Sequence, residues 1–348
     1  MEKKTIIIIL LAMILILAAI IILVSRPQLS PTSNSNLETC NSISYASSSA
    51  INLVFLSTQE QAKEYSDYLE TISPYNKDSF NIYQIEDNQN CDLYQNKAVF
   101  CYSKELVKKA SSCPNDIIIA ITSHPASIRS SAYMNVISIN SNNNKNVLAH
   151  ELGHALAFLA DEYVPATLPK KSENCQKTCT FKPCFQGCSN EDYYRSIDNG
   201  IMKTLSSSDY GDYNKNLISK YLPSNSITGH AIEETQECSN QEYYLIQGNY
   251  SEDKIQVISK SIEPGCIGNT GVGDFSYNLI LDNNLNFTGN FNPEFIFTDS
   301  DSEGGVLISD GLFFLKIPII ENAKTLEIIK ENKIAEINLQ EDSRPCRI

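Results

Sequence analysis

The sequence predicts an α/β domain with a mixed sheet, followed by a C-terminal β-sandwich and preceded by a transmembrane helix. Three observations lead to this fold class. Strand-length apolar runs alternate with amphipathic segments up to about residue 160, short strand-like segments between Asn, Gly and Asp turns follow residue 236, and an uncharged run lies near the N-terminus. We therefore divide the 348 residues into a transmembrane segment (1–26), a stalk (27–47), a first folded domain (48–235) and a β-sandwich (236–348).

The N-terminal run comprises residues 5–24, twenty residues without a charge. At about 1.5 Å per residue, a helix of this length spans the roughly 30 Å hydrocarbon core of a bilayer. Lys3 and Lys4 precede it, which favours a cytoplasmic N-terminus and an exported body. The alternative is a cleaved signal peptide and a secreted protein, but such peptides have shorter apolar regions that end in a small-residue pattern. We expect an uncleaved signal-anchor, then a flexible Ser-, Asn- and Pro-rich stalk.

Charge and cysteine content narrow the partners and the compartment. The formal charge of −14 argues against nucleic acid and anionic lipid headgroups as partners. Eleven cysteines fit an oxidising, extracytoplasmic compartment. The cluster of Cys175, Cys179, Cys184 and Cys188 lacks the usual spacing of a four-thiolate zinc site, so we expect two disulfides there. Cys91, Cys101 and Cys113 could contribute another bridge. The odd total leaves at least one thiol unpaired or paired between chains, and the sequence does not give the connectivity.

Elements of the first domain follow from apolar periodicity. We expect strands at 51–56, 80–85 and 116–122 and helices at 59–72 and 104–110. The nearly continuous apolar run at 116–122 is typical of a buried central strand. Residues 134–140 alternate apolar with polar side chains, which predicts an edge strand to which an extended peptide could add.

Strand-like segments recur in the last third of the chain at the spacing of a sandwich. They lie at 243–247, 254–259, 274–281, 311–317, 324–329 and 334–339. Asn249 and Asn286 begin glycosylation sequons, which agrees with export.

His150, Glu151 and His154 form an HExxH motif inside an apolar segment of helical character. On a helix, residues i and i+4 share a face, so both imidazoles can bind one zinc ion. The glutamate can then reach the fourth zinc position and act as general base. Asn144 or Asn146 could cap the helix. The alternative reading is a buried helix that carries two histidines.

Two longer segments resemble one family of zinc peptidases. Residues 150–163, HELGHALAFLADEY, resemble the zinc motif of the igalysin or IgA-peptidase-like metallopeptidases, which are metzincin relatives. Residues 193–202 resemble their YRP-x-x-N-S-(I/M)-M segment, although Ser196 replaces the proline and Asn199-Gly200 replaces the NS pair. The resemblance covers about residues 48–215. It implies a metzincin-like fold with an active-site helix, Asp161 as the third zinc ligand with Glu162 as the alternative, and Met202 in a methionine turn beneath the zinc.

The spacing between the motif and Asp161 requires a break in the helix. Continued straight, the helix would place Asp161 about 10 Å beyond His154, too far for a bond of about 2 Å. We therefore expect the helix to end near Leu159, with the chain folding back. A thermolysin-like site would instead take a distant glutamate as its third ligand, and the candidates are Glu173, Glu191 and Glu233.

Other residues have candidate roles around this site. A tyrosine hydroxyl could help to hold the oxyanion, and the candidates are Tyr163, Tyr210 and Tyr213. We expect His124 and His230 to be structural or surface groups rather than ligands.

Two functions from different classes fit these features. The first is an extracytoplasmic, membrane-anchored zinc endopeptidase that acts on a protein or peptide substrate. The second is a non-catalytic surface adhesion or binding protein in which zinc only stabilises the fold. Glu151 favours the peptidase, because a structural zinc needs no base beside its ligand, and no cysteine closes the fourth position within the motif.

Overall fold

The computed structural model describes residues 37–88, 90–169, 172–223, 238–251, 254–268, 275–281, 286–291, 311–331 and 333–340. They belong to one compact unit, Leu37–Ile348. The predicted membrane segment at 5–24 and the first part of the stalk lie outside these residues. A search of the described ranges finds no helix with the length and apolar character of a membrane span.

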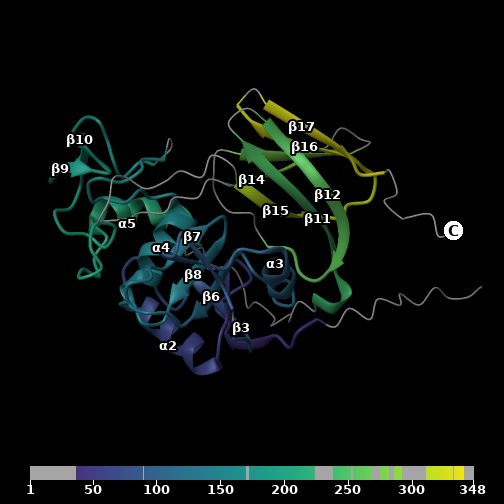
Figure 1. The fold of residues 1–348 in the computed structure, drawn as a ribbon, viewed down its shortest axis with the longest axis horizontal. Helices are drawn as coiled ribbons and strands as arrows, with labels where there is room; N and C mark the ends of the chain where they lie inside the picture. The colour runs from purple at the N-terminus through teal and green to yellow at the C-terminus, as the bar shows by residue number, and fades with distance from the viewer. Residues whose placement is uncertain are drawn as a thin grey trace, which may run out of the picture. The chain divides into compact units, whose positions relative to one another are not determined.

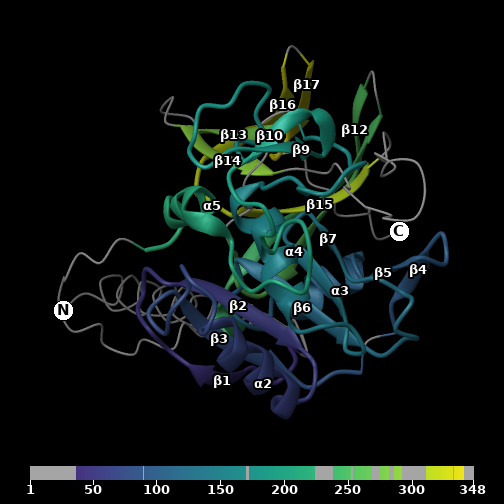
Figure 2. The same ribbon diagram turned by 90° about the vertical axis from the view of Figure 1, so that its left-hand side faces the viewer.

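A six-stranded mixed sheet forms the centre of the first domain (Figure 2). Its strand order is β1 (Asn41–Ser44), β3 (Phe80–Ile85), β2 (Ile51–Leu56), β6 (Ile117–Thr122), β8 (Val136–Asn140) and β7 (Ser131–Tyr133). The four inner strands are parallel, whereas β1 and β7 pair antiparallel with their neighbours. The predicted mixed sheet is thus confirmed.

Both faces of this sheet are covered, which explains its continuous apolar runs. Leu53 and Phe55 of β2 contact the face that carries α2 (Gln59–Leu69) and α4 (Asn146–Ala157). Val54 and Leu56 alternate to the opposite face and pack with α3 (Lys104–Ala110) and with strands from the C-terminal part of the chain. Helix α2 begins at a capping box formed by Thr58 and Gln61 and ends three residues before the predicted end.

The prediction of an edge strand at 134–140 is wrong. Met134 has φ of 56° and reverses the chain, so that β7 pairs antiparallel with β8 and β8 lies between β6 and β7, buried along its length. Just before β7, the Arg129 N–H donates to the Lys97 carbonyl, and the Arg129 carbonyl accepts from the Val99 N–H of β5 (Ala98–Phe100). Strand β5 in turn pairs with β4 (Asp92–Tyr94). Backbone groups on both sides of β8 are therefore already paired, and an added peptide finds no edge there.

Two antiparallel sheets follow in the C-terminal part (Figure 1). One contains β12 (Lys254–Pro264), β11 (Glu242–Ser251) and β15 (Gly311–Pro318); the other contains β14 (Asn286–Phe291), β13 (Phe275–Leu281), β16 (Ala323–Lys330) and β17 (Lys333–Asn338). Ile246 and Phe313 from the first sheet share a core with Phe275 and Leu326 from the second. The six predicted strands are confirmed, they pair antiparallel, and β14 is present in addition. The boundary at 235/236 lies in the undescribed segment 224–237 and stays a prediction.

Strands β11 and β15 also pack against the mixed sheet. On β11, Tyr243 and Leu245 belong to the core beneath the mixed sheet, whereas Ile246 points into the C-terminal core. The Phe314 backbone N–H on β15 donates to the Tyr102 hydroxyl at 2.7 Å. The three-stranded C-terminal sheet therefore contributes to the core on one face of the mixed sheet.

Five disulfides join ten of the cysteines: Cys40–Cys113, Cys91–Cys101, Cys175–Cys188, Cys179–Cys184 and Cys238–Cys266. The two nested bridges within 175–188 confirm that this cluster holds disulfides. Cys346 lies outside the described residues. Five bridges indicate an extracytoplasmic location, because disulfides persist in oxidising compartments.

Candidate metal centre

Helix α4 carries the HExxH motif and begins directly after β8. Its N-cap is Lys145, which makes no side-chain capping bond, so the prediction that Asn146 caps the helix is wrong. The Asn144 side chain instead accepts from the Asn146 backbone N–H at 2.9 Å. The Asn146 side chain bonds outward, accepting from the Tyr68 hydroxyl and donating to the Leu205 carbonyl. Asn146 thus fixes the first turn of the helix to its surroundings.

The helix ends where the expected break was placed. Phe158 adopts φ of 53° in the left-handed region, and its N–H bonds to the His154 carbonyl at 3.1 Å, as in an αL C-cap. The Leu159 N–H reaches back to the Gly153 carbonyl. A non-glycine residue in this conformation costs on the order of 1 kcal/mol. The chain folds back after Phe158 and returns Asp161 to the helix face that carries the histidines.

Both histidines are oriented by backbone carbonyls. Nδ1 of His150 lies 2.9 Å from the Ile201 carbonyl oxygen, and Nδ1 of His154 lies 2.5 Å from that of Leu159. Because a carbonyl oxygen only accepts, Nδ1 carries the proton in each ring. A neutral imidazole then presents Nε2 as a lone pair, which is the form that binds a metal ion.

Three potential ligand atoms converge on one point. Nε2 of His150 and Nε2 of His154 lie 3.2 Å apart, and the Asp161 Oδ1 lies 3.1 Å from the first and 3.5 Å from the second. A tetrahedral ion with bonds of about 2.0–2.1 Å holds its ligand atoms about 3.3–3.4 Å apart. These three residues form a buried group that could hold a metal ion.

Electrostatics at this group favour a cation. Asp161 is fully buried, and neither of its carboxylate oxygens accepts a hydrogen bond from the described residues. Burial raises the pKa of Asp161, but the two histidines outweigh it and hold the pKa well below its usual value. Burial lowers the pKa of His150, whereas the Asp161 carboxylate raises it, to about 9. The pKa of His154 is raised in the same way. Without a metal ion, protonation of the histidines supplies the positive charge that stabilises this buried carboxylate. A metal ion at the same point would take the place of the proton on Nε2 and leave each histidine neutral.

Glu151 lies on the same helix between the two histidines. Its side chain is buried, and this burial raises the pKa of its carboxyl group, while His150 and His154 oppose the shift. Together with both histidines, Glu151 lines a cleft of about 550 Å³. The Glu151 carboxyl group and the group that could hold a metal therefore face the same space.

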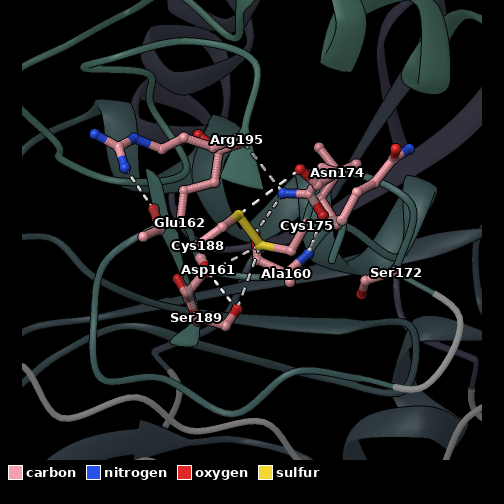
Figure 3. The surroundings of a disulfide bond; sticks show 12 residues. Ala160, Asp161, Glu162, Ser172, Asn174, Cys175, Cys188, Ser189 and Arg195 are labelled. Atoms are coloured by element: carbon pink, nitrogen blue, oxygen red, sulfur yellow. Dashed lines mark hydrogen bonds between the residues drawn. A yellow bond between two sulfur atoms is a disulfide. The ribbon is translucent and has the colours of Figure 1, made fainter. Parts of the chain in front are cut away.

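The loop after the helix holds Asp161 through its neighbours (Figure 3). The Asn174 side chain accepts from the Ala160 N–H and donates to the Ala160 carbonyl, both at 2.8 Å. The Ser189 hydroxyl donates to the Asp161 carbonyl at 2.6 Å. The Cys175–Cys188 disulfide packs against Ala160 in a small buried cluster.

Glu162, the alternative third ligand, points away from the histidines. Its Oε1 accepts from Asn214 on α5 (Gly211–Ser219) at 2.8 Å and from Asn174 at 3.3 Å. Burial raises the pKa of Glu162 to about 7, and the two asparagines partly offset this. Its backbone N–H donates to the Met202 carbonyl at 2.8 Å. Glu162 thus ties the loop to the turn that contains Met202.

Met202 lies beneath the helix in a tight turn. The Lys203 N–H bonds to the Gly200 carbonyl at 2.9 Å, and the turn presents the Ile201 carbonyl to His150. A Cβ placed on Gly153 would lie 2.9 Å from the Met202 Sδ, so a larger residue at this position would have to displace Met202. Arg195, at the end of β10 (Asn190–Arg195), donates to the Asp198 carbonyl and leads the chain into this turn. The two sequence motifs are therefore in direct contact.

Among the three tyrosines considered for an oxyanion role, only Tyr163 lines the cleft. Tyr210 is buried beneath α4, where its hydroxyl bonds to the Ala149 carbonyl and meets the Tyr75 hydroxyl. Tyr213 lies beside Gln176, to which its hydroxyl is bonded at 2.7 Å. Burial raises the pKa of both Tyr210 and Tyr213.

Of the thermolysin-like alternatives, the two that lie in the described residues, Glu173 and Glu191, are not brought to the histidines. Glu173 is exposed and pairs with Lys220 at 3.1 Å, and Glu191 is exposed on β10. His124 follows β6, with its backbone N–H bonded to the Asn140 side chain. His230 and Glu233 lie outside the described residues.

Sequence reasoning missed the residues that hold the third member of the group. Asn174 and Ser189 carry no motif, but each lies next to a cysteine of the Cys175–Cys188 bridge. The cysteine cluster was the available signal, since it marked a constrained segment soon after Asp161.

Comparison with protein-family models gives no match for this chain, and comparison with curated proteins gives none either.

Proposed function

We propose that the chain is an extracytoplasmic zinc-dependent endopeptidase of metzincin-like fold, related to the igalysin or IgA-peptidase-like metallopeptidases and anchored by its N-terminal segment, with a C-terminal β-sandwich as accessory domain. The observation that carries the proposal is the convergence of His150 Nε2, His154 Nε2 and Asp161 Oδ1 at 3.1–3.5 Å beside Glu151 in an open cleft. Two neutral histidines and one carboxylate are a donor set suited to catalytic zinc, which keeps a fourth position for water or substrate.

Each residue of the site has a defined role in this proposal. His150, His154 and Asp161 hold the ion. Bound there, zinc supplies Lewis-acid chemistry that polarises a carbonyl oxygen and acidifies water. Glu151 takes the proton from the attacking water and delivers it to the leaving amine. Tyr163 lines the cleft on the path of the substrate and is the candidate donor to the developing oxyanion.

The cysteines support an active rather than a thiol-latent site. Cys40, which directly precedes β1, is bonded to Cys113, so its sulfur is not available as a fourth ligand. Cys175 and Cys188 lie close to Asp161 but are bonded to each other. These pairings leave the fourth position to water and substrate.

A comparison of Glu151→Gln with Asp161→Ala tests the proposal on the full chain in detergent. Zinc content is measured by atomic absorption, and cleavage is measured with a broad library of quenched fluorescent peptides. We expect Glu151→Gln to retain zinc and lose cleavage, because it keeps the ligands and removes the base. We expect Asp161→Ala to lose both. Wild type that binds zinc and cleaves no more than Glu151→Gln would refute the peptidase and support the adhesion protein.

A further inference from the structure

The third member of the metal group depends on more of the chain than the two histidines do. His150 and His154 are fixed by a helix and by backbone carbonyls. Asp161 instead lies three residues beyond the left-handed Phe158, outside any helix or strand. Ordering such a segment costs roughly 1–2 kcal/mol per residue in conformational entropy, so something outside the helix must hold it in place.

Asn174 supplies the first of two contacts. Its side chain is fully buried and bonds both the N–H and the carbonyl of Ala160, at 2.8 Å each. A side chain that satisfies both backbone groups of one residue fixes the direction in which the chain leaves it. The next residue along the chain is Asp161, so this contact sets the position of Asp161.

Ser189 supplies the second contact, and a disulfide joins the two. The Ser189 hydroxyl donates to the Asp161 carbonyl at 2.6 Å. Cys175 follows Asn174 and Cys188 precedes Ser189, so the Cys175–Cys188 bond links the residues next to both contacts. Both sulfurs belong to buried residues that pack on Ala160, as Figure 3 shows.

We propose that Asn174, Ser189 and the Cys175–Cys188 disulfide act as one positioning device that holds Asp161 against the histidines and thereby sets the affinity of the metal site. This rests on the proposed zinc site but not on peptidase activity. The same segment contains a second bridge, Cys179–Cys184, which closes a short loop with Cys179 exposed. The chain thus offers a matched control within 13 residues.

The test measures zinc affinity of the full chain by competition with a fluorescent chelator. We expect Asn174→Ala, Ser189→Ala and the pair Cys175→Ser/Cys188→Ser to weaken zinc binding roughly 10–100-fold, the range found when residues that orient metal ligands are removed. Cys179→Ser/Cys184→Ser should bind zinc as wild type does.

A second control distinguishes the positioning of Asp161 from a general loss of stability on removal of a buried asparagine. Asn115→Ala removes another fully buried asparagine that bonds two carbonyls, those of Ala110 and Cys113, away from the metal group. It should lower the melting temperature of the zinc-free chain without changing zinc affinity. If Asn174→Ala does not fold, Ser189→Ala and the cysteine pairs decide.

The possible failures are distinct. Wild type that binds no zinc overturns the proposed function together with this inference. Wild-type zinc affinity in Ser189→Ala and in Cys175→Ser/Cys188→Ser overturns the positioning device alone, as does equal weakening by the two cysteine pairs.

Discussion

Lys316 gives the pH dependence that can be worked furthest from the structure. It lies on β15, only 5% exposed, between the C-terminal sheets and the first domain. Its Nζ donates to the Asn115 Oδ1 at 2.5 Å and lies 5.9 Å from the Tyr243 ring centre. Burial lowers the pKa of Lys316 to about 7, and the charge of Asp116 opposes this only in part.

The sign of the effect follows from proton binding in the two states. Between pH 7 and pH 10.5 the unfolded chain holds a proton on Lys316 that the folded chain does not, so stability rises with pH through this window. Below pH 7 the destabilisation is fully present. A shift from 10.5 to about 7 corresponds to on the order of 5 kcal/mol, of which roughly 3 kcal/mol should be recovered between pH 7 and pH 9.5.

Urea unfolding of wild type and Lys316→Met at pH 7 and pH 9.5 measures the contribution of Lys316 to the free energy of unfolding. The chain has no tryptophan but 18 tyrosines, so near-ultraviolet circular dichroism follows tertiary structure. The free energy of unfolding of wild type relative to Lys316→Met should increase with pH. Lys254→Met, at an exposed position on β12, is the control. A wild-type-minus-variant difference that is equal at both pH values would refute the reasoning.

Three further predictions concern the metal group, helix α4, and the contact between the first domain and β15. Zinc should raise the melting temperature of wild type and of the surface variant Asp67→Ala but not of Asp161→Ala, because only a chain that binds the ion in its folded state is stabilised by it; a zinc-induced rise in Asp161→Ala would contradict this ligand. Gly153→Ala should lower the free energy of unfolding, because overpacking against Met202 costs about 1–3 kcal/mol and exceeds the gain in helix propensity; an unchanged urea midpoint would show that Met202 moves aside. Tyr102→Phe should cost about 1–3 kcal/mol in urea unfolding, because it leaves the buried Phe314 N–H without its partner; a cost close to zero would mean that water replaces the hydroxyl.

Local elements were predictable wherever the apolar pattern had one interpretation. Strands β2 and β3 and helix α3 lie at the predicted residues, since each has its own apolar run and clear end signals. The failure at 134–140 arose because alternation marks a strand but does not identify its neighbours. Residues 131–133 are too short to stand out, and β7 forms only because Met134 turns the chain back along β8.

Some residues of the site were predictable from local spacing, whereas others depend on the folded loop. The positions of His150, Glu151 and His154 follow from helical spacing, and the break before Asp161 follows from the length of a straight helix. Glu162 could not be separated from Asp161 by spacing, because adjacent carboxylates differ only in where the folded loop directs them. Asn214 and Asn174, 52 and 12 residues away from it, draw Glu162 aside.

By itself, the sequence predicted the helix with its two histidines and Glu151, the end of that helix before Asp161, and an oxidising compartment, because these depend on local geometry and composition. Tertiary structure alone decided which carboxylate meets the histidines, that Met202 packs directly beneath Gly153, and which residues hold the loop in place. Those features depend on contacts between segments far apart in the chain, such as Met202 beneath Gly153 and Asn174 beside Ala160. Periodicity carries no information about such contacts, since they exist only once the chain has packed.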